Sequence, residues 1–248
     1  MSVRQTRIPT PKGSKILHAS LRLQGRPDPL LVHVKVASGS DLSEATEKLE
    51  REAKTLAELP AHFSEDWSGF QYMKEFEYDH KDGILPAHAV APKFYGYYVP
   101  EGRVDRMLLR PFIVFEDCGM PIDVNRMSAN DRATVYSFAH RLHRRGIVHG
   151  AIEAPNVLVQ PGPLSKPPSQ RSIDTPSYRI VNWGAALQSS SVTRKEWDRL
   201  THDEVEDAKE AFYGKFVLRS KPLKKSGYEV IARKHWVHHK PVYRWVDV

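Results

Sequence analysis

Strand-like and helix-like stretches are mixed along this chain, and their mixture is the strongest constraint on its fold. The segment from Leu30 to Ala37 is rich in Leu and Val and runs into a Ser-Gly-Ser turn, a pattern that predicts a strand. The next segment, from Leu42 to Leu59, has high helix propensity with apolar residues on one face, and it stops at Pro60. Both patterns in one chain predict an α+β fold.

Further stretches extend the mixture toward the middle of the chain. Residues 113–115 are apolar and end in two acids, which predicts a short buried strand. Ser128 and Asp131 have the spacing of a helix start, and an apolar face continues from them to about Arg145. We expect Gly146 to end this helix.

The last third of the chain predicts a hairpin and a helix. Two apolar runs, Asn156 to Val159 and Tyr178 to Val181, are separated by a Pro- and Ser-rich stretch that predicts a long exposed loop. The two runs could pair as a hairpin. Thr201 and Glu204 form a capping-box pattern, which predicts a final helix that begins there and ends before Gly214.

Length and cysteine content limit the class of protein. With 248 residues the chain can form one large domain, or two small lobes that share a cleft. The lone Cys118 excludes a disulfide or a thiolate zinc site within the chain, which fits a reducing compartment. No apolar run approaches the roughly 18 residues of a membrane-spanning helix, and the N-terminus lacks the apolar core of a secretory signal. We expect a cytoplasmic or nuclear protein without a membrane span.

The net charge of +7 is concentrated at the two ends. Residues 1–27 carry six Lys or Arg and no acid, and residues 215–248 carry nine bases and two acids. Two basic ends on a mildly acidic body indicate either arms that touch an anionic partner or solubilising termini with little order. Residues 1–14 in particular, with little apolar content, are predicted to be a flexible basic arm.

Five short motifs follow one another in an order that resembles the protein kinases. They are Val32-His33-Val34-Lys35, Glu52 in the predicted helix, Ile113 to Gly119, His149 to Asn156, and Asn182-Trp183-Gly184. The kinase set is a strand lysine, a helix glutamate, an H-R-D-L-x-x-x-N loop and D-F-G. The resemblance covers roughly residues 30–187. The sequence from Arg145 to Gly150 is similar to that of compact kinase-like proteins of fungi.

The resemblance implies a two-lobed fold. Residues 15–119 would form a small β-rich N-lobe with one helix, followed by the hinge that binds a nucleotide. Residues 120–248 would form a shortened helical C-lobe with a basic C-terminal segment, because no A-P-E motif follows Gly184.

The resemblance also implies roles for single residues. Lys35 and Glu52 would form an ion pair across the cleft. The backbone groups of Glu116 and Cys118 would recognise the adenine of a nucleotide. Asn156 matches the residue that contacts nucleotide-bound metal, so it joins these as a nucleotide-binding candidate. Asn156 and Asn182 would together form a weak metal site.

The residues that phosphoryl transfer requires are degenerate. Ala151 stands where the kinases have the catalytic Asp, so a general base is missing. Asn182 replaces the metal-binding Asp and brings no charge. Glu153 puts an anion where a Lys is frequent, and the chain upstream of Lys35 has no G-x-G-x-x-G. We expect ATP binding to be weak, if it occurs, and Mg²⁺ not to be held tightly.

The C-terminal segment combines histidines, bases and aromatic residues. His235, His238 and His239 have a spacing that suits a metal poorly. The interleaved bases and aromatic residues from Arg233 to Trp245 could stack on a nucleic acid strand, or pack against the lobe as a closing segment.

Three hypotheses therefore remain. The first is a pseudokinase that binds a protein partner or a nucleotide as a regulatory module. The second is an atypical active ATP-dependent protein kinase. The third is a binder of nucleic acid or an anionic surface that has reused the fold, supported by the charged ends alone.

Overall fold

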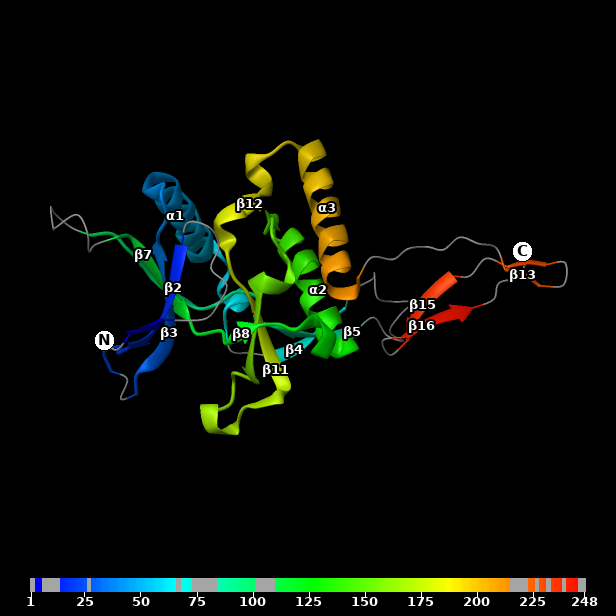
Figure 1. The fold of residues 1–248 in the computed structure, drawn as a ribbon, viewed down its shortest axis with the longest axis horizontal. Coiled ribbons are helices and arrows are strands. Elements are labelled where there is room, and N and C mark those ends of the chain that lie inside the picture. The colour runs from blue at the N-terminus through cyan, green and yellow to red at the C-terminus, as the bar shows by residue number, and fades with distance from the viewer. Residues whose placement is uncertain are drawn as a thin grey trace.

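The structure, a computed structural model, is a mixed α+β protein with antiparallel sheets, as the sequence predicts (Figure 1). It describes residues 14–25, 28–65, 88–100 and 110–214 with their side chains. It describes the backbone alone for residues 3–5, 68–72, 84–87, 223–225, 228–230, 233–237 and 240–244. The α-helices are α1 (Leu42–Glu58), α2 (Ala129–His143) and α3 (Arg194–Tyr213). None of the helices in these ranges is long and apolar enough to cross a membrane.

The strands form one five-stranded sheet and several small ones. The large sheet contains β1 (Val3–Gln5), β2 (Ser14–Leu21), β3 (Leu30–Ala37), β7 (Phe112–Glu116) and β6 (Phe94–Tyr98), in that spatial order. A second sheet has the order β11 (Ser172–Ile180), β10 (Val157–Gly162), β8 (Met120–Pro121). The two-stranded pairs are β4 (Ser68–Tyr72) with β5 (Ile84–His88), β9 (Ile147–Val148) with β12 (Leu187–Gln188), β13 (Leu223–Lys225) with β14 (Tyr228–Val230), and β15 (Arg233–Val237) with β16 (Lys240–Arg244).

The predicted strand from Leu30 to Ala37 is confirmed as β3, at the centre of the large sheet. Side chains alternate between the two faces of a strand, so Lys35 shares its face with His33 and Ala37. This face is covered by α1, because Ala37, Ile113 and Phe115 belong to the same buried cluster as the apolar side of the helix. Lys35 therefore points toward the protein interior.

The predicted helix after β3 is confirmed as α1 and begins at an acidic cap. Asp41 accepts a hydrogen bond from the backbone N–H of Glu44 at 3.0 Å, which satisfies a free donor of the first turn. Leu49, Ala53 and Leu56 are buried on one face, and Glu52 is buried beside them. The helix ends at Glu58, one residue before the predicted end.

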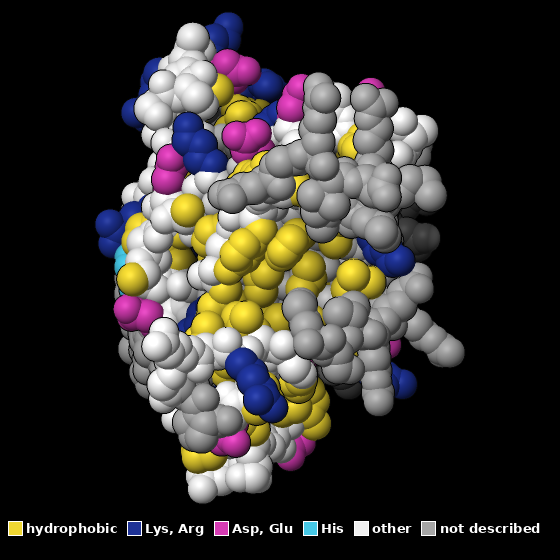
Figure 2. Space-filling model, turned by 90° about the vertical axis from the view of Figure 1, so that its left-hand side faces the viewer, with side chains coloured by type: hydrophobic (Ala, Val, Ile, Leu, Met, Phe, Trp, Pro, Cys, Tyr) yellow, Lys and Arg dark blue, Asp and Glu magenta, His cyan; other side chains and the backbone are white. Residues whose placement is uncertain are grey.

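The face of the large sheet opposite Lys35 carries a second apolar cluster. Its buried members are Ala19, Val32, Val34 and Val114, with Leu17, Leu21, Leu30, Val36, Tyr95 and Phe112 partly buried around them. Figure 2 looks onto this side of the molecule and shows hydrophobic side chains gathered near its centre. The large sheet is thus apolar on both faces.

The predicted hairpin is confirmed, but its loop is shorter than expected. β10 pairs antiparallel with β11, with Val157 opposite Ile180. The pairing resumes beyond an irregularity at Gly162 and Ser172, so residues 163–171 alone connect the strands. The sequence prediction of a long exposed loop is wrong there because β-pairing extends into the Pro-rich stretch, where the Thr175 hydroxyl donates to the Gly162 carbonyl.

The helix start at Ser128 is confirmed. Ser128 and Asp131 form a reciprocal capping box at the start of α2. The helix ends at His143, two residues before Arg145, and Gly146 follows in a left-handed conformation with φ of +71°. A glycine adopts this conformation without strain.

The predicted start of the last helix is wrong. α3 begins at Arg194, with the Thr193 side chain as its cap, and Thr201 lies inside the helix. The Thr201 hydroxyl donates to the Trp197 carbonyl one turn earlier, so it does not cap. Exposed pairs such as Arg194 with Asp198 support the polar first two turns, which the apolar pattern did not reveal.

Both ends of the chain contain short strands. β1 pairs antiparallel with β2, and it contains part of the predicted arm of residues 1–14. β15 and β16 form a hairpin within the predicted basic C-terminal segment. Residues 6–13 of the arm, His238, His239 and Trp245 lie outside the described residues.

Candidate functional site

A buried ion pair joins β3 to α1. The Lys35 ammonium lies 2.6 Å from Oε2 of Glu52, and the two side chains are 7% and 4% exposed. The predicted pair is therefore confirmed. A charge of either sign is costly in this environment unless it is paired.

A second contact links this ion pair to the end of β11. Lys35 donates at 2.8 Å to Oδ1 of Asn182, which directly follows the last apolar residues of the hairpin. Asn182 has a left-handed backbone, with φ of +71°, at the start of the single 3₁₀ turn Trp183–Ala185. Asn tolerates this conformation better than most residues. The turn lies against α1, where a Cβ added to Gly184 would be 3.2 Å from the Lys48 carbonyl.

Asn156 continues the polar chain into the loop from His149 to Asn156. The Asn182 side-chain amide donates to Oδ1 of Asn156. The amide of Asn156 donates in turn to the Ala151 carbonyl at 3.0 Å and to Oε1 of Glu153 at 3.2 Å. Segments far apart in sequence thus meet in one hydrogen-bonded series: Glu52, Lys35, Asn182, Asn156, and the loop that contains Ala151 and Glu153.

The donors and acceptors of this series are largely engaged within the chain. Lys35 has three N–H groups, of which one is left after Glu52 and Asn182 among the contacts of the described residues. The side-chain oxygens of Asn156 and Asn182 each accept a hydrogen bond already. Mg²⁺ prefers carboxylates and several further oxygens in octahedral geometry. These two neutral amides do not fit a tight Mg²⁺ site.

The loop is held from behind by a buried histidine and a buried glutamate. His149 is fully buried, and its ring packs edge-on against Trp183 at 4.7 Å between centroids. Burial lowers the pKa of His149 to about 4, against smaller raising contributions from Glu204 and the Val181 backbone. The imidazole is therefore neutral at pH 7, in keeping with a structural role.

Sequence reasoning missed the part that Glu204 of α3 plays here. Its carboxylate accepts from the backbone N–H of Gly150 and lies 2.6 Å from Nε2 of His143 on α2. Through these contacts Glu204 links the loop from His149 to Asn156 to both α2 and α3. An acid on an otherwise apolar helix face is the signal in the sequence, although the spacing of Glu204 from Thr201 predicts a helix cap instead.

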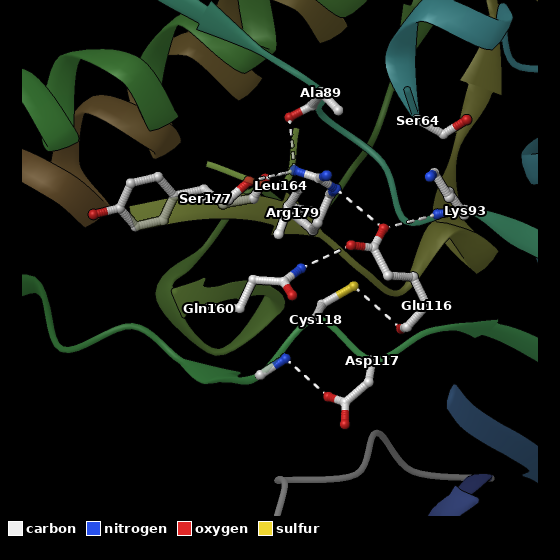
Figure 3. A network of polar contacts seen from close by, with 12 residues as sticks. Ser64, Ala89, Lys93, Glu116, Asp117, Cys118, Gln160, Leu164, Ser177 and Arg179 are labelled. Atoms are coloured by element: carbon white, nitrogen blue, oxygen red, sulfur yellow. Dashed lines mark hydrogen bonds and ion pairs between the residues drawn. The ribbon is translucent and has the colours of Figure 1, made fainter. Parts of the chain in front are cut away.

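Glu116, predicted in the nucleotide hinge, takes part in a separate buried network (Figure 3). Its carboxylate accepts from the Gln160 amide at 2.8 Å and the Lys93 backbone N–H at 3.1 Å, and it lies 3.4 Å from Nε of Arg179. The backbone N–H of Glu116 donates to the Lys93 carbonyl at 2.9 Å. Its side chain and N–H are thus used to hold β7, β10 and β11 together.

Cys118 and Gly119 complete this segment. Cys118 is fully buried, and its thiol lies 3.3 Å from the Glu116 carbonyl. Burial raises the pKa of the Cys118 thiol well above its usual value, so the thiol is unreactive at neutral pH. Gly119 has φ of +80°, and a Cβ there would lie 2.1 Å from the Val159 carbonyl, so the segment passes close to β10.

The structure thus brings Lys35, Glu52, Asn156, Asn182 and the loop of Ala151 and Glu153 together, and it puts Glu116 and Cys118 in a different network. The known protein-family models do not match this chain, and neither do the curated proteins.

Proposed function

We propose that this chain is a pseudokinase with a two-lobed protein-kinase-like fold, acting as a regulatory module that binds a protein partner or, weakly, a nucleotide. One observation carries the proposal. The series from Glu52 through Lys35 and Asn182 to Asn156 joins four motifs that are up to 147 residues apart, and it contains the Lys35–Glu52 pair that the resemblance implies. Unrelated polar residues have no reason to meet in that order.

The surrounding fold supports the proposal. A five-stranded antiparallel sheet with one helix after the lysine strand matches the small N-lobe that the resemblance implies. The His149 loop lies between α2 and the hairpin that leads to Asn182, as a catalytic loop would. α2 and α3 form a shortened helical C-lobe in this reading (Figure 1).

The chemistry of the site argues against phosphoryl transfer. A general base must lie within hydrogen-bond reach of the attacking hydroxyl, and Ala151 has no side chain that can accept a proton. Glu153 is the acid of that loop, and its carboxylate accepts from Asn156. Because the Asn156 and Asn182 amides bond each other, the polar series serves to hold the site in shape.

Binding is the function that such a site retains. One N–H of Lys35 is left for a phosphate group, so affinity for ATP would be low. The preserved scaffold instead offers a partner protein a fixed arrangement of β3, α1 and the His149 loop.

The decisive experiment is a radiolabelled ATP transfer assay on the full chain, with generic protein substrates and autophosphorylation read together. We expect no transfer above that of a Lys35→Met control. Robust transfer by the wild type that Lys35→Met abolishes would overturn the proposal in favour of an atypical active kinase. A parallel binding isotherm for nucleic acid, measured at two salt concentrations, would detect the remaining alternative through its steep salt dependence.

A further inference from the structure

Two histidines and an aspartate meet on the sheet face that also carries Lys35. His18 of β2 is directly opposite His33 of β3, and Asp117 follows the end of β7. Nδ1 of His18 lies 3.3 Å from Oδ2 of Asp117, and Nε2 of His33 lies 3.4 Å from Oδ1. One ligand atom from each residue lies within 4.8 Å of the others. The kinase-like motifs assign no binding or catalytic role to any of these three residues.

His33 is the unusual member of this group. Its side chain is 1% exposed, and among the described residues its Nε2 has no hydrogen-bond partner, although it faces the Asp117 carboxylate. Leaving a buried polar atom unpaired costs about 1–3 kcal/mol, so such atoms call for a ligand or a special reason. An imidazole nitrogen is the commonest metal ligand that side chains provide.

The spacing of these atoms suits a tetrahedral ion. Two ligands that are each 2.0–2.1 Å from a zinc ion at a tetrahedral angle are about 3.3–3.4 Å apart. The two histidine-to-carboxylate distances are of this size, although each ends on a different oxygen of Asp117. The His18 and His33 rings lie 4.5 Å apart between centroids, and a small movement of the partly exposed His18 would bring its nitrogen to an ion beside His33.

The aspartate is already held in place by the backbone. Oδ1 of Asp117 accepts from the N–H of Gly119 at 3.0 Å. Gly119 itself is fixed by its close approach to β10. Outer contacts of this kind orient ligating carboxylates in metal sites. His18 and Asp117 are partly exposed, 35% and 22%, so an ion can reach the buried His33 between them.

We propose that His18, His33 and Asp117 bind a divalent transition metal of the zinc class, with a fourth coordination position open to water or to a ligand of a partner. Two imidazoles and one carboxylate favour zinc and its neighbours over Mg²⁺ or Ca²⁺, which prefer oxygen ligands. The proposal goes beyond the proposed function and stands without it, because none of its three residues belongs to the series from Glu52 to Asn156.

The test is a calorimetric titration of the full chain with ZnCl₂ after treatment with a chelator and its removal, with MgCl₂ as the comparison. Besides wild type it uses His18→Ala and Asp117→Asn, which remove partly exposed ligands, and His202→Ala, which removes an exposed histidine on α3 as a matched control. A His238→Ala/His239→Ala variant removes the adjacent histidines near the C-terminus. Far-UV circular dichroism checks the fold of each variant.

We expect one Zn²⁺ per chain, no comparable Mg²⁺ binding, and a loss of at least about tenfold in affinity for His18→Ala and Asp117→Asn. His202→Ala and the His238→Ala/His239→Ala variant should bind as wild type does. Zn²⁺ should also raise the unfolding temperature of wild type, and of His18→Ala much less. The absence of a one-to-one site, or a site that His18→Ala leaves intact, would overturn the proposal.

Discussion

The Lys35 ammonium and the Glu52 carboxylate lie 2.6 Å apart, in an ion pair that joins the central strand of the large sheet to the helix packed on it. Both groups are almost entirely shielded from water. The attraction between them offsets a large desolvation cost, so each group depends on the other. The pair therefore fixes the position of α1 relative to β3.

Removing one partner should destabilise the fold strongly. We expect Glu52→Ala to lower the free energy of unfolding by about 3–5 kcal/mol, because it leaves the Lys35 charge buried with Asn182 as its remaining neighbour. The matched control is Glu44→Ala on the same helix, which breaks an exposed pair with Lys48 and should cost about 0.2–0.5 kcal/mol. Urea denaturation measures both. Equal losses for the two variants would contradict a structural role for the buried pair.

Nucleotide affinity should be nearly indifferent to Mg²⁺. Neither Asn156 nor Asn182 brings charge to a metal, and the oxygens of both amides accept hydrogen bonds within the chain. Calorimetric titration with ATP, in Mg²⁺ and in a chelator, should give dissociation constants within tenfold of each other, a difference below about 1.4 kcal/mol. A larger gain with Mg²⁺ would show that another group supplies the missing carboxylate.

Local patterns in the sequence predicted those parts of the fold that neighbouring residues determine. The strand of residues 30–37 and the helix after it follow from composition and periodicity, and the capping box of Ser128 and Asp131 follows from spacing alone. The Lys35–Glu52 pair required the order of motifs as well, because periodicity does not show which strand residue meets which helix residue.

Contacts between distant residues could not be predicted in this way. Arg179 and Glu116 are 63 residues apart, and their meeting depends on how β10 and β11 pair beside β7. Glu204 was assigned to a helix cap because its spacing from Thr201 fits one, whereas its partners, Gly150 and His143, come from other parts of the chain. His18 and His33 become neighbours through strand register, which a single sequence does not reveal.

Stability should fall as the solution becomes acidic, partly through His149. Its pKa is about 4 in the folded protein, below the ordinary value of 6.5. Above pH 6.5 the residue is neutral in both states, and as the pH falls toward 4 the unfolded chain alone takes up the proton. Folding should therefore lose about 3 kcal/mol over this range from His149 alone, at about 1.4 kcal/mol per pKa unit.

Urea denaturation at a series of pH values tests this contribution. His149→Leu should show a shallower fall than wild type between pH 6.5 and pH 4, whatever its stability at pH 7. His202→Ala, which alters an exposed histidine, should follow the wild-type slope. If His149→Leu keeps the wild-type slope, other groups cause the acid sensitivity. His33 is the first candidate, because burial lowers its pKa to about 4 as well.

Under the proposed function, carboxylates introduced at positions 182 and 151 should give Mg²⁺ binding without turnover. In Asn182→Asp the new carboxylate stays beside Lys35 but loses the N–H that Asn182 donates to Asn156. An oxygen of the new carboxylate would then face Oδ1 of Asn156. Mg²⁺ bound between these two oxygens would offset their repulsion, so Mg²⁺ affinity should rise in this variant. Ala151→Asp alone should restore nothing, because catalytic groups act as a unit and the metal site would still lack its charge.

The double variant should remain far below the roughly 1–100 s⁻¹ of an ordinary kinase. Glu153 would still put an anion beside the transferring phosphate, and the Asn156 amide would still be engaged by Ala151 and Glu153 through its two N–H groups. Mg²⁺ titration by calorimetry and radiolabelled ATP transfer, run on wild type, both single variants and the double variant, separate binding from catalysis. Turnover in the double variant at a kinase-like rate would contradict this expectation and would show that Glu153 does not prevent phosphoryl transfer.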